Sequence, residues 1–155
     1  MRLRKYQSGV NLLELMIVLV IASLLASLAV PTYDRYVQRA KVRKAMGDIG
    51  SLSLEIERFR LRSRDRVPVN LVELGIDLPD DPWGRPYIFL NIIDGGPAII
   101  GAARKDGMLN PLNTDYDLFS RGKDGEYAGP LNAGKSRDDV VRANNGAFIG
   151  LGEDY

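Results

Sequence analysis

A single carboxylate stands near the start of the longest apolar segment of this chain. Glu14 is followed by residues 15–30, none of which is charged. A charge at the centre of a membrane-spanning helix costs roughly 2.5–3.5 kcal/mol even on a lenient insertion scale. A segment that served only as an anchor would omit this carboxylate. We therefore expect Glu14 to pair with a positive charge.

The composition argues against the common catalytic sites. The chain has no His and no Cys, so it has no Ser-His-Asp triad, no Cys-His pair, no His or Cys zinc ligand and no disulfide. The adjacent carboxylates Asp80 and Asp81 lie between Pro79 and Pro82, which suits the capping of a turn better than acid–base catalysis. A formal net charge of +1 gives no reason to expect nucleic-acid binding. We predict that the protein is not an enzyme.

A long interrupted helix, from about residue 10 to about residue 62, is predicted to carry Glu14. Residues 10–30 would extend roughly 31 Å, enough to cross a bilayer core. Pro31 lacks a backbone donor, so we expect it to bend or loosen the helix near residues 27–30. After Pro31, apolar residues recur every three or four positions and predict a stripe that covers a small head: Val42, Ala45, Met46, Ile49, Leu52, Ile56 and Phe59.

The rest of the chain predicts an α+β head with a small antiparallel sheet and a C-terminal loop region. Strands are expected at residues 87–91, 97–103 and 116–120, with a hairpin turn at residues 94–96. A short helix is expected within residues 68–78, and Phe148 and Ile149 should pack back on the head. The side chains of the short helix expected to face inward are Leu71, Val72, Leu74 and Ile76.

The N-terminal pattern resembles the class III signal of type IV pilins and type II secretion pseudopilins. Basic residues at positions 2, 4 and 5 precede Gly9, Glu14 would be the fifth residue after a cut at Gly9, and Pro31 the twenty-second. The resemblance implies cleavage between Gly9 and Val10 and methylation of the new amine of Val10. The Val10 residue departs from the usual Phe. A plain signal anchor with a chance glutamate is the alternative.

Two motifs in the head are similar to those of the major pseudopilin branch. Residues 81–87 match the signature Asp-Pro-Trp-Gly-x-Pro-Tyr, and residues 116–125 match Tyr-Asp-Leu-x-Ser-x-Gly-x-Asp-Gly. The resemblance implies a cleaved leader at residues 1–9, a transmembrane and filament-core helix at residues 10–31, and a periplasmic head at residues 32–155.

This resemblance implies a structural subunit of a type II secretion pseudopilus that drives protein export. In the filament, Glu14 of one copy would meet the Val10 ammonium of another and enforce the axial register. The implied partners are copies of the chain, the prepilin peptidase, minor pseudopilins, the inner-membrane assembly platform and, before assembly, membrane lipid. The implied location is the bacterial inner membrane, with a single pass and a periplasmic head, and then the periplasmic filament.

The resemblance also implies a calcium site in the loop after residue 120. The ligands would be the carboxylates of Asp124, Asp138 and Asp139 and the backbone carbonyls of Arg121 and Glu126. Calcium takes six to eight oxygen ligands in a flexible cage, which suits such a loop. Lysine and arginine side chains flank these residues, so a turn closed by salt bridges is the alternative.

Other functions remain open at this point. The same N-terminus would serve a major or minor type IV pilin of a surface pilus, used for adhesion, motility or DNA uptake. An anchored calcium-binding module that does not polymerise is a further alternative. The basic residues between Arg35 and Lys44 form a solvated face, contact lipid phosphates, or pair with Asp48, Glu55 or Glu57 of a neighbouring head.

Overall fold

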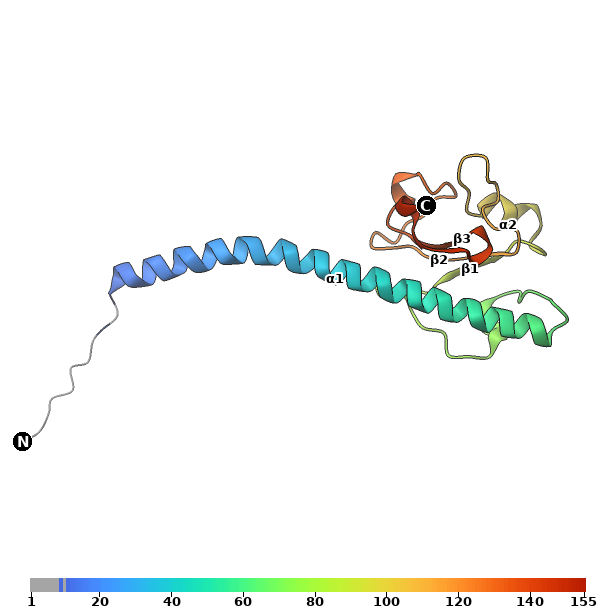
Figure 1. Ribbon diagram of the computed structural model, residues 1–155, viewed down its shortest axis with the longest axis horizontal. Helices are drawn as coiled ribbons and strands as arrows, with labels where there is room; N and C mark the ends of the chain where they lie inside the picture. Colours follow the sequence, from blue (N-terminus) through green and yellow to red (C-terminus); the bar gives the residue numbers. More distant parts are fainter. Residues whose placement is uncertain (1–8, 10) are drawn as a thin grey trace, which may run out of the picture. The chain divides into compact units, whose positions relative to one another are not determined.

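The computed structural model describes Gly9 and residues 11–155. The basic leader positions and Val10, the predicted methylation position, lie outside the described residues. The chain divides into two compact units, of which the first ends at Gln38 and the second begins at Arg39. The helix α1 (Leu12–Arg62) contributes to both units (Figure 1).

The first unit consists of the N-terminal part of α1. Asn11 caps this helix, because its Oδ1 accepts a hydrogen bond from Leu13 N at 3.2 Å and its carbonyl accepts one from Leu15 N at 3.1 Å. The helix continues through Pro31 without interruption. The Ser23 and Ser27 hydroxyls donate to carbonyls of their own helix, at 2.8 and 2.7 Å. The predicted extent of the helix is therefore confirmed, but the predicted interruption near Pro31 is wrong, because one missing backbone donor does not end a helix of 51 residues. The cap was not predicted.

The apolar side chains of this first unit are exposed. The most apolar window of α1 has a mean hydropathy of 2.6, and none of its residues is buried. By length and composition, α1 is able to cross a membrane. A helix of this composition is not stable in water with its whole surface exposed, so its surface must be covered by something outside the unit.

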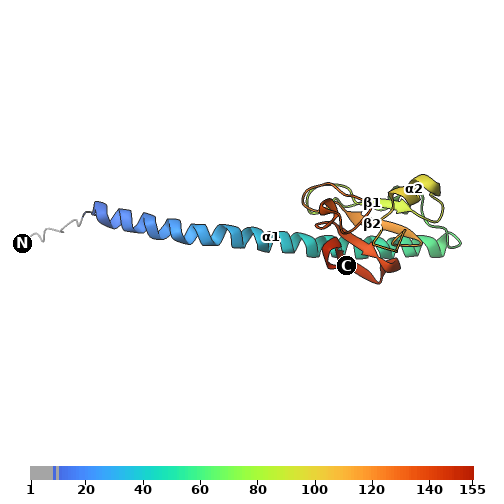
Figure 2. The ribbon, with the colours of Figure 1, turned by 90° about the horizontal axis from the view of Figure 1, so that it is seen from above.

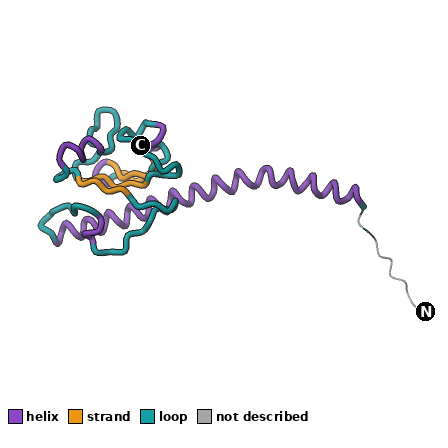
Figure 3. The backbone as a smooth tube through the Cα atoms, turned by 180° about the vertical axis from the view of Figure 1, so that it is seen from behind, coloured by secondary structure: helices purple, strands orange, loops and turns teal. Residues whose placement is uncertain are grey.

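The second unit contains a four-stranded antiparallel sheet. Its strands β1 (Ile88–Asn91), β2 (Tyr116–Ser120), β3 (Val140–Ala143) and β4 (Phe148–Leu151) pair in chain order. Residue Phe89 pairs with Leu118, and Val141 pairs with Gly150. The strands lie between residues 39–62 of α1 and a layer of loops (Figure 3). The predicted α+β class is confirmed.

Alternating side chains give the sheet two apolar faces. One face packs on the stripe of α1, where Ala45, Ile49, Leu52 and Ile56 are buried together with Tyr116 and Leu118. The opposite face is covered by loops, and Figure 2 shows these loops and α2 beside the strands. Its buried residues are Leu112, Phe119, Leu131, Val141 and Ala143.

Two predictions about the strands are wrong. Residues 97–103 were expected to form a strand after a hairpin, but the structure has the helix α2 (Gly96–Ala102). Pro97 lies in the first turn of α2, where its missing donor costs nothing. The turn before it is fixed by Asn91, whose Oδ1 accepts from Asp94 N at 3.0 Å. The strands β3 and β4 were not predicted, because residues 140–151 were interpreted as loop and tail.

The short helix is also only partly as predicted. It is a 3₁₀-helix at Leu71–Leu74, and the side chain of Asn70 caps it by accepting from Val72 N at 3.0 Å. Leu71 and Leu74 are buried as expected. Val72 is 74% exposed, because successive side chains of one short helical turn point in different directions. Ile76 is 37% exposed and lies beyond the helix, which ends before Gly75. The predicted packing of Phe148 and Ile149 against the head is confirmed.

Candidate functional site

Glu14 lies in the first turn of α1 and is exposed. Unpaired backbone N–H groups give the start of a helix a partial positive charge, so a carboxylate is favoured there. Within the described residues, the carboxylate of Glu14 forms no ion pair. The predicted partner, the Val10 amine, is outside the described residues. The pairing of Glu14 with Val10 of another copy stays a prediction.

The two head motifs are joined through Asp81. Its Oδ1 accepts from Trp83 N at 3.0 Å and from Arg85 N at 2.9 Å, which holds the turn. Its Oδ2 accepts from the Ser120 hydroxyl at 2.5 Å, at the end of β2. Asp81 is nearly fully buried, at 3% exposure. The expectation that Asp81 caps a turn is therefore confirmed.

The guanidinium of Arg85 extends this connection into the predicted calcium loop. Its Nη2 donates to the carbonyls of Gly122 and Lys123, at 3.0 and 3.1 Å. Gly125 must be glycine here, because its φ is 78° and an added Cβ would lie 1.6 Å from Arg85 Nη1. Arg85 therefore occupies the space directly beside the loop backbone.

Backbone donors already engage Asp138 and Asp124. Asp138 Oδ2 accepts from Lys123 N at 2.7 Å and from Asp124 N at 3.0 Å. Asp124 Oδ1 accepts from Glu126 N at 2.8 Å, and the carbonyl of Arg121 accepts from Gly125 N at 3.1 Å. These hydrogen bonds bring Asp124 and Asp138 to the same turn, as the resemblance implies.

Asp139 lies in a different environment from its neighbour. It is fully buried, and its Oδ2 is 2.8 Å from Nη2 of the equally buried Arg104. This contact is an ion pair without hydrogen-bond alignment, and Asp139 Oδ1 has no hydrogen-bond donor among the described residues. The pKa of Asp139 is raised to about 7, mainly by burial and also by the charges of Asp138 and Asp124, against the opposing effect of Arg104.

The residues of the loop do not form a calcium cage as they are arranged. Within the described residues, no group of three acidic side chains is placed to hold a metal ion. Asp138 and Asp124 accept backbone hydrogen bonds, and Asp139 faces a guanidinium. A calcium ion needs six to eight oxygens that point to one centre. Calcium binding by this loop stays a prediction, and the observed geometry does not favour it.

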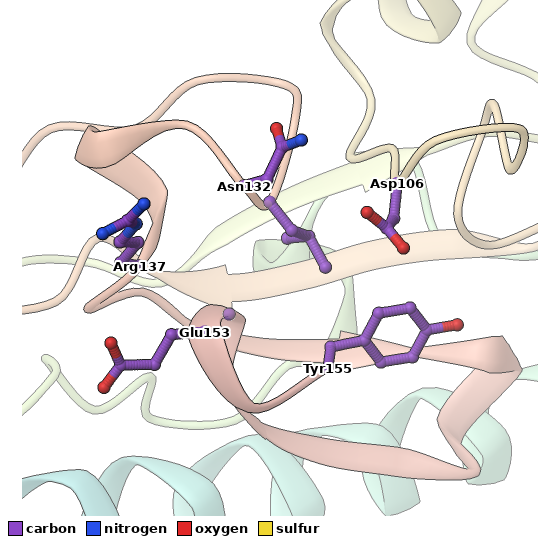
Figure 4. Close-up of a pocket in the computed structure, with 7 residues that line it drawn as sticks. Asp106, Asn132, Arg137, Glu153 and Tyr155 are labelled. Atoms are coloured by element: carbon purple, nitrogen blue, oxygen red, sulfur yellow. The ribbon is translucent and has the colours of Figure 1, made fainter.

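A polar cavity of about 410 Å³ lies beside this loop (Figure 4). In Figure 4, Arg137 and Glu153 line one side, and Asp106 and Tyr155 line the other. The lining residues combine one guanidinium with two carboxylates and a phenol, and they include no nucleophile paired with a base. The cavity gives no support for catalysis.

The acidic residues of α1 in the head have partners within the chain. Lys44 Nζ is 2.8 Å from Asp48, and Arg60 Nη1 is 3.0 Å from Glu57. Glu55 pairs with Arg58. These contacts are the ordinary i,i+3 and i,i+4 pairs of an exposed helix. The predicted pairing of these carboxylates with a neighbouring head is untested.

Sequence reasoning missed several residues that matter at these sites. Asn11 had a signal, because an Asn directly before an apolar helix is a typical N-cap. The buried guanidiniums of Arg104 and Arg142 had none, because their carboxylate partners are distant in the sequence. Arg142 forms a paired contact with Asp115 at 2.7 Å and lies 3.9 Å from the ring centre of Tyr116.

Comparison with known proteins identifies the family. No family model and no solved structure matches the chain. The chain is 29% identical to type II secretion system core protein G of Pseudomonas aeruginosa, over 83% of this chain and 92% of that protein. It is 32% identical to the protein of the same name from Escherichia coli (strain K12), over 81% and 88%.

A shorter similarity links the chain to a pilus protein. It is 35% identical to the type IV major fimbrial protein FimA of Dichelobacter nodosus over 63 residues, which are 41% of this chain and 40% of that protein. The long matches to secretion proteins agree with the two head motifs, which the structure joins at Asp81 and Ser120. The chain belongs to the family of type II secretion system core protein G, the major pseudopilins.

Proposed function

We propose that this chain is a structural subunit that polymerises through the N-terminal part of α1 into a type II secretion pseudopilus and so drives protein export. The observation that carries the proposal is the exposure of this part of the helix. Leu12 is 74% exposed and Leu28 is 71% exposed, and no apolar residue between them is buried. An apolar surface of this extent marks a membrane or protein contact.

Lipid and neighbouring copies cover this surface in turn. Before assembly, the apolar side chains of residues 12–30 lie in the bilayer core. In the filament, the same side chains pack against α1 of other copies. Ala22, Ala26 and Ala29 support this packing, because small residues let helices approach closely. The head stays outside both environments, since it buries two apolar clusters of its own.

Glu14 supplies the register of the assembly. Cleavage after Gly9 releases the amine of Val10, and methylation leaves its positive charge in place. In an apolar filament core, an unpaired Glu14 is costly, whereas a pair with the Val10 ammonium of another copy compensates both charges. Only one axial offset between copies places these groups together, so the pair selects that offset.

The location and the partners follow from this assembly. The subunit crosses the inner membrane once, with its head in the periplasm, and then moves into a periplasmic filament. The prepilin peptidase, the minor pseudopilins and the inner-membrane assembly platform act on it in sequence.

A second candidate is a type IV pilin of a surface pilus. The similarity to the fimbrial protein FimA favours it over part of the chain. The two candidates share the assembly through α1 and differ in what the filament serves. Deletion of the gene separates them: loss of protein export with normal surface pili supports the pseudopilus, and loss of surface pili with normal export supports the pilin.

The experiment that tests the proposal is the substitution Glu14→Gln in the full chain, produced in cells with the secretion machinery. Sheared filaments are examined by electron microscopy, and exported protein is measured in the medium. We expect filaments and export to be lost, while thermal unfolding of the head is unchanged. The control Glu55→Gln removes a partly exposed carboxylate of α1 in the head and should assemble normally. Normal filaments from Glu14→Gln would contradict the proposal.

A further inference from the structure

Two arginine side chains from other parts of the head contact the loop between β2 and β3. Three carboxylates, those of Asp124, Asp138 and Asp139, gather in this loop. Their charges repel unless a cation or hydrogen-bond donors compensate them. The chain contains no disulfide that would tie the loop to the sheet. Something else must hold residues 121–139 in place.

Arg104 lies in the interior of the head and contacts this loop from within. Its side chain is fully buried, and its guanidinium lies 4.7 Å from the ring centre of Phe119 and 5.8 Å from that of Tyr127. Its Nη1 donates to the carbonyl of Ala128 at 2.9 Å, and its Nη2 faces Asp139. One planar cation therefore contacts the sheet, the middle of the loop and the end of the loop.

The position of Arg104 is fixed by its own backbone. Arg104 N donates to Asp117 Oδ2 at 2.6 Å, and Asn113 Nδ2 donates to Asp117 Oδ1 at 2.8 Å. Asp117 belongs to β2, so the sheet anchors the segment that carries the guanidinium. If this side chain moved away, the buried carboxylate of Asp139 would be left uncompensated, because neither of its oxygens accepts a hydrogen bond among the described residues.

Arg85 acts on the other side of the loop. Its guanidinium donates to two successive carbonyls, those of Gly122 and Lys123. Carbonyls that converge on one point are the groups a metal ion binds, and here a side chain takes them. A calcium ion beside Asp139 would also lie close to the buried guanidinium of Arg104, and the two positive charges would repel.

We infer that Arg104 and Arg85 close this loop as built-in cations, in place of a calcium ion. Arg104 compensates the charge of the buried Asp139 carboxylate, and Arg85 donates hydrogen bonds to two carbonyls of the turn. The loop then needs no metal to fold. This inference concerns the stability of the head, and it does not depend on the filament proposed above.

The test compares thermal unfolding of the full chain in a mild non-ionic detergent, with calcium chloride or with the chelator EGTA. The variants are Arg104→Met, Asp139→Asn and the combination of both. The matched control is Arg137→Met, which removes an exposed positive charge directly beside the same carboxylates. A second control is the unmodified chain.

The inference predicts that calcium does not change the melting temperature of the unmodified chain, and that it does not change that of Arg137→Met. Arg104→Met and Asp139→Asn should each melt at a clearly lower temperature, since each leaves one buried charge alone. The double variant should recover much of this loss, because it removes both charges. Calcium that restores Arg104→Met alone would also support the inference, since the ion would then stand in for the guanidinium.

Three results would overturn the inference. The first is a melting temperature of the unmodified chain that rises with calcium and falls with EGTA. The second is an Arg104→Met variant that unfolds like the unmodified chain in both solutions. A double variant that loses the sum of both single losses would show that Arg104 and Asp139 do not act as a pair, and would likewise contradict it.

Discussion

The two units of this chain differ in whether their apolar and charged side chains are buried and paired. In the N-terminal part of α1, apolar residues from Leu12 to Val30 are exposed, and Glu14 has no ion-pair partner among the described residues. In the head, even charged side chains such as Arg104 and Asp139 are buried and paired. The head buries its charged groups and apolar clusters within one chain, whereas we propose that lipid or other copies cover the exposed helix.

This difference predicts whether a mutation should change the stability of the monomer or its assembly. A change in the head should alter the free energy of unfolding of the monomer, because the affected contacts lie within one chain. A change in residues 12–30 should leave that free energy unchanged and act on assembly. The following predictions test this division, from the largest expected effect to the smallest.

The largest effect is expected for a pair of matched truncations. Phe119→Ala removes a fully buried ring from the core between the sheet and the loops and should lower the free energy of unfolding by ~3–5 kcal/mol. Leu24→Ala truncates a residue that is 61% exposed and should change it by less than about 0.5 kcal/mol. Chemical denaturation of the full chain in detergent measures both. Equal losses in the two variants would contradict the division.

The next effect concerns the buried ion pair on the other face of the sheet. Arg142→Met leaves Asp115 without its paired guanidinium and removes a contact with Tyr116, so we expect a loss of about 3 kcal/mol. The carbonyl of Tyr116 also loses the donor at 3.0 Å. Thermal and chemical unfolding measure the loss. Arg142→Lys serves as the control: because an ammonium lacks the planar fork, it should recover only part of the stability.

The smallest effect is expected for the exposed pair on α1. Lys44→Ala removes an ion pair with Asp48, but the side chain of Lys44 is 58% exposed. Solvent and salt screen such pairs, so the loss should be at most about 0.5 kcal/mol. The same denaturation curves measure it. A loss as large as that of Arg142→Met would show that burial does not separate the two kinds of pair.

Local patterns explain how much of the fold the sequence predicts. The spacing of Ala45, Ile49, Leu52 and Ile56 belongs to one helix, and all four are buried as expected. The strand β1 directly follows the first motif and β2 lies in the second, and turn residues of these motifs mark their ends. Residues 97–103 contain β-branched and small residues without clear periodicity, so only the tertiary structure decides that Gly96–Ala102 is helical.

The candidate sites divide in the same way. The sequence places Asp81 in a turn correctly, since its partners Trp83 and Arg85 are close in the chain. It brings Asp124 and Asp138 together only through the resemblance. It does not predict that Asp139 faces Arg104, because nothing in the spacing of residues 104 and 139 reports that they meet. Such a pairing appears only when the sheet has formed.

The central claim is that residues 12–30 pack against other copies in the filament, in a register set by Glu14. Because the chain has no cysteine, single substitutions such as Ala22→Cys and Ala26→Cys provide unique cross-linking sites, and Val72→Cys in the head provides a control. After mild oxidation of cells that carry the secretion machinery, the account predicts disulfide-linked dimers at the helix positions, lost when Glu14→Gln is added. Dimers that persist with Glu14→Gln, or none at any helix position, would contradict it.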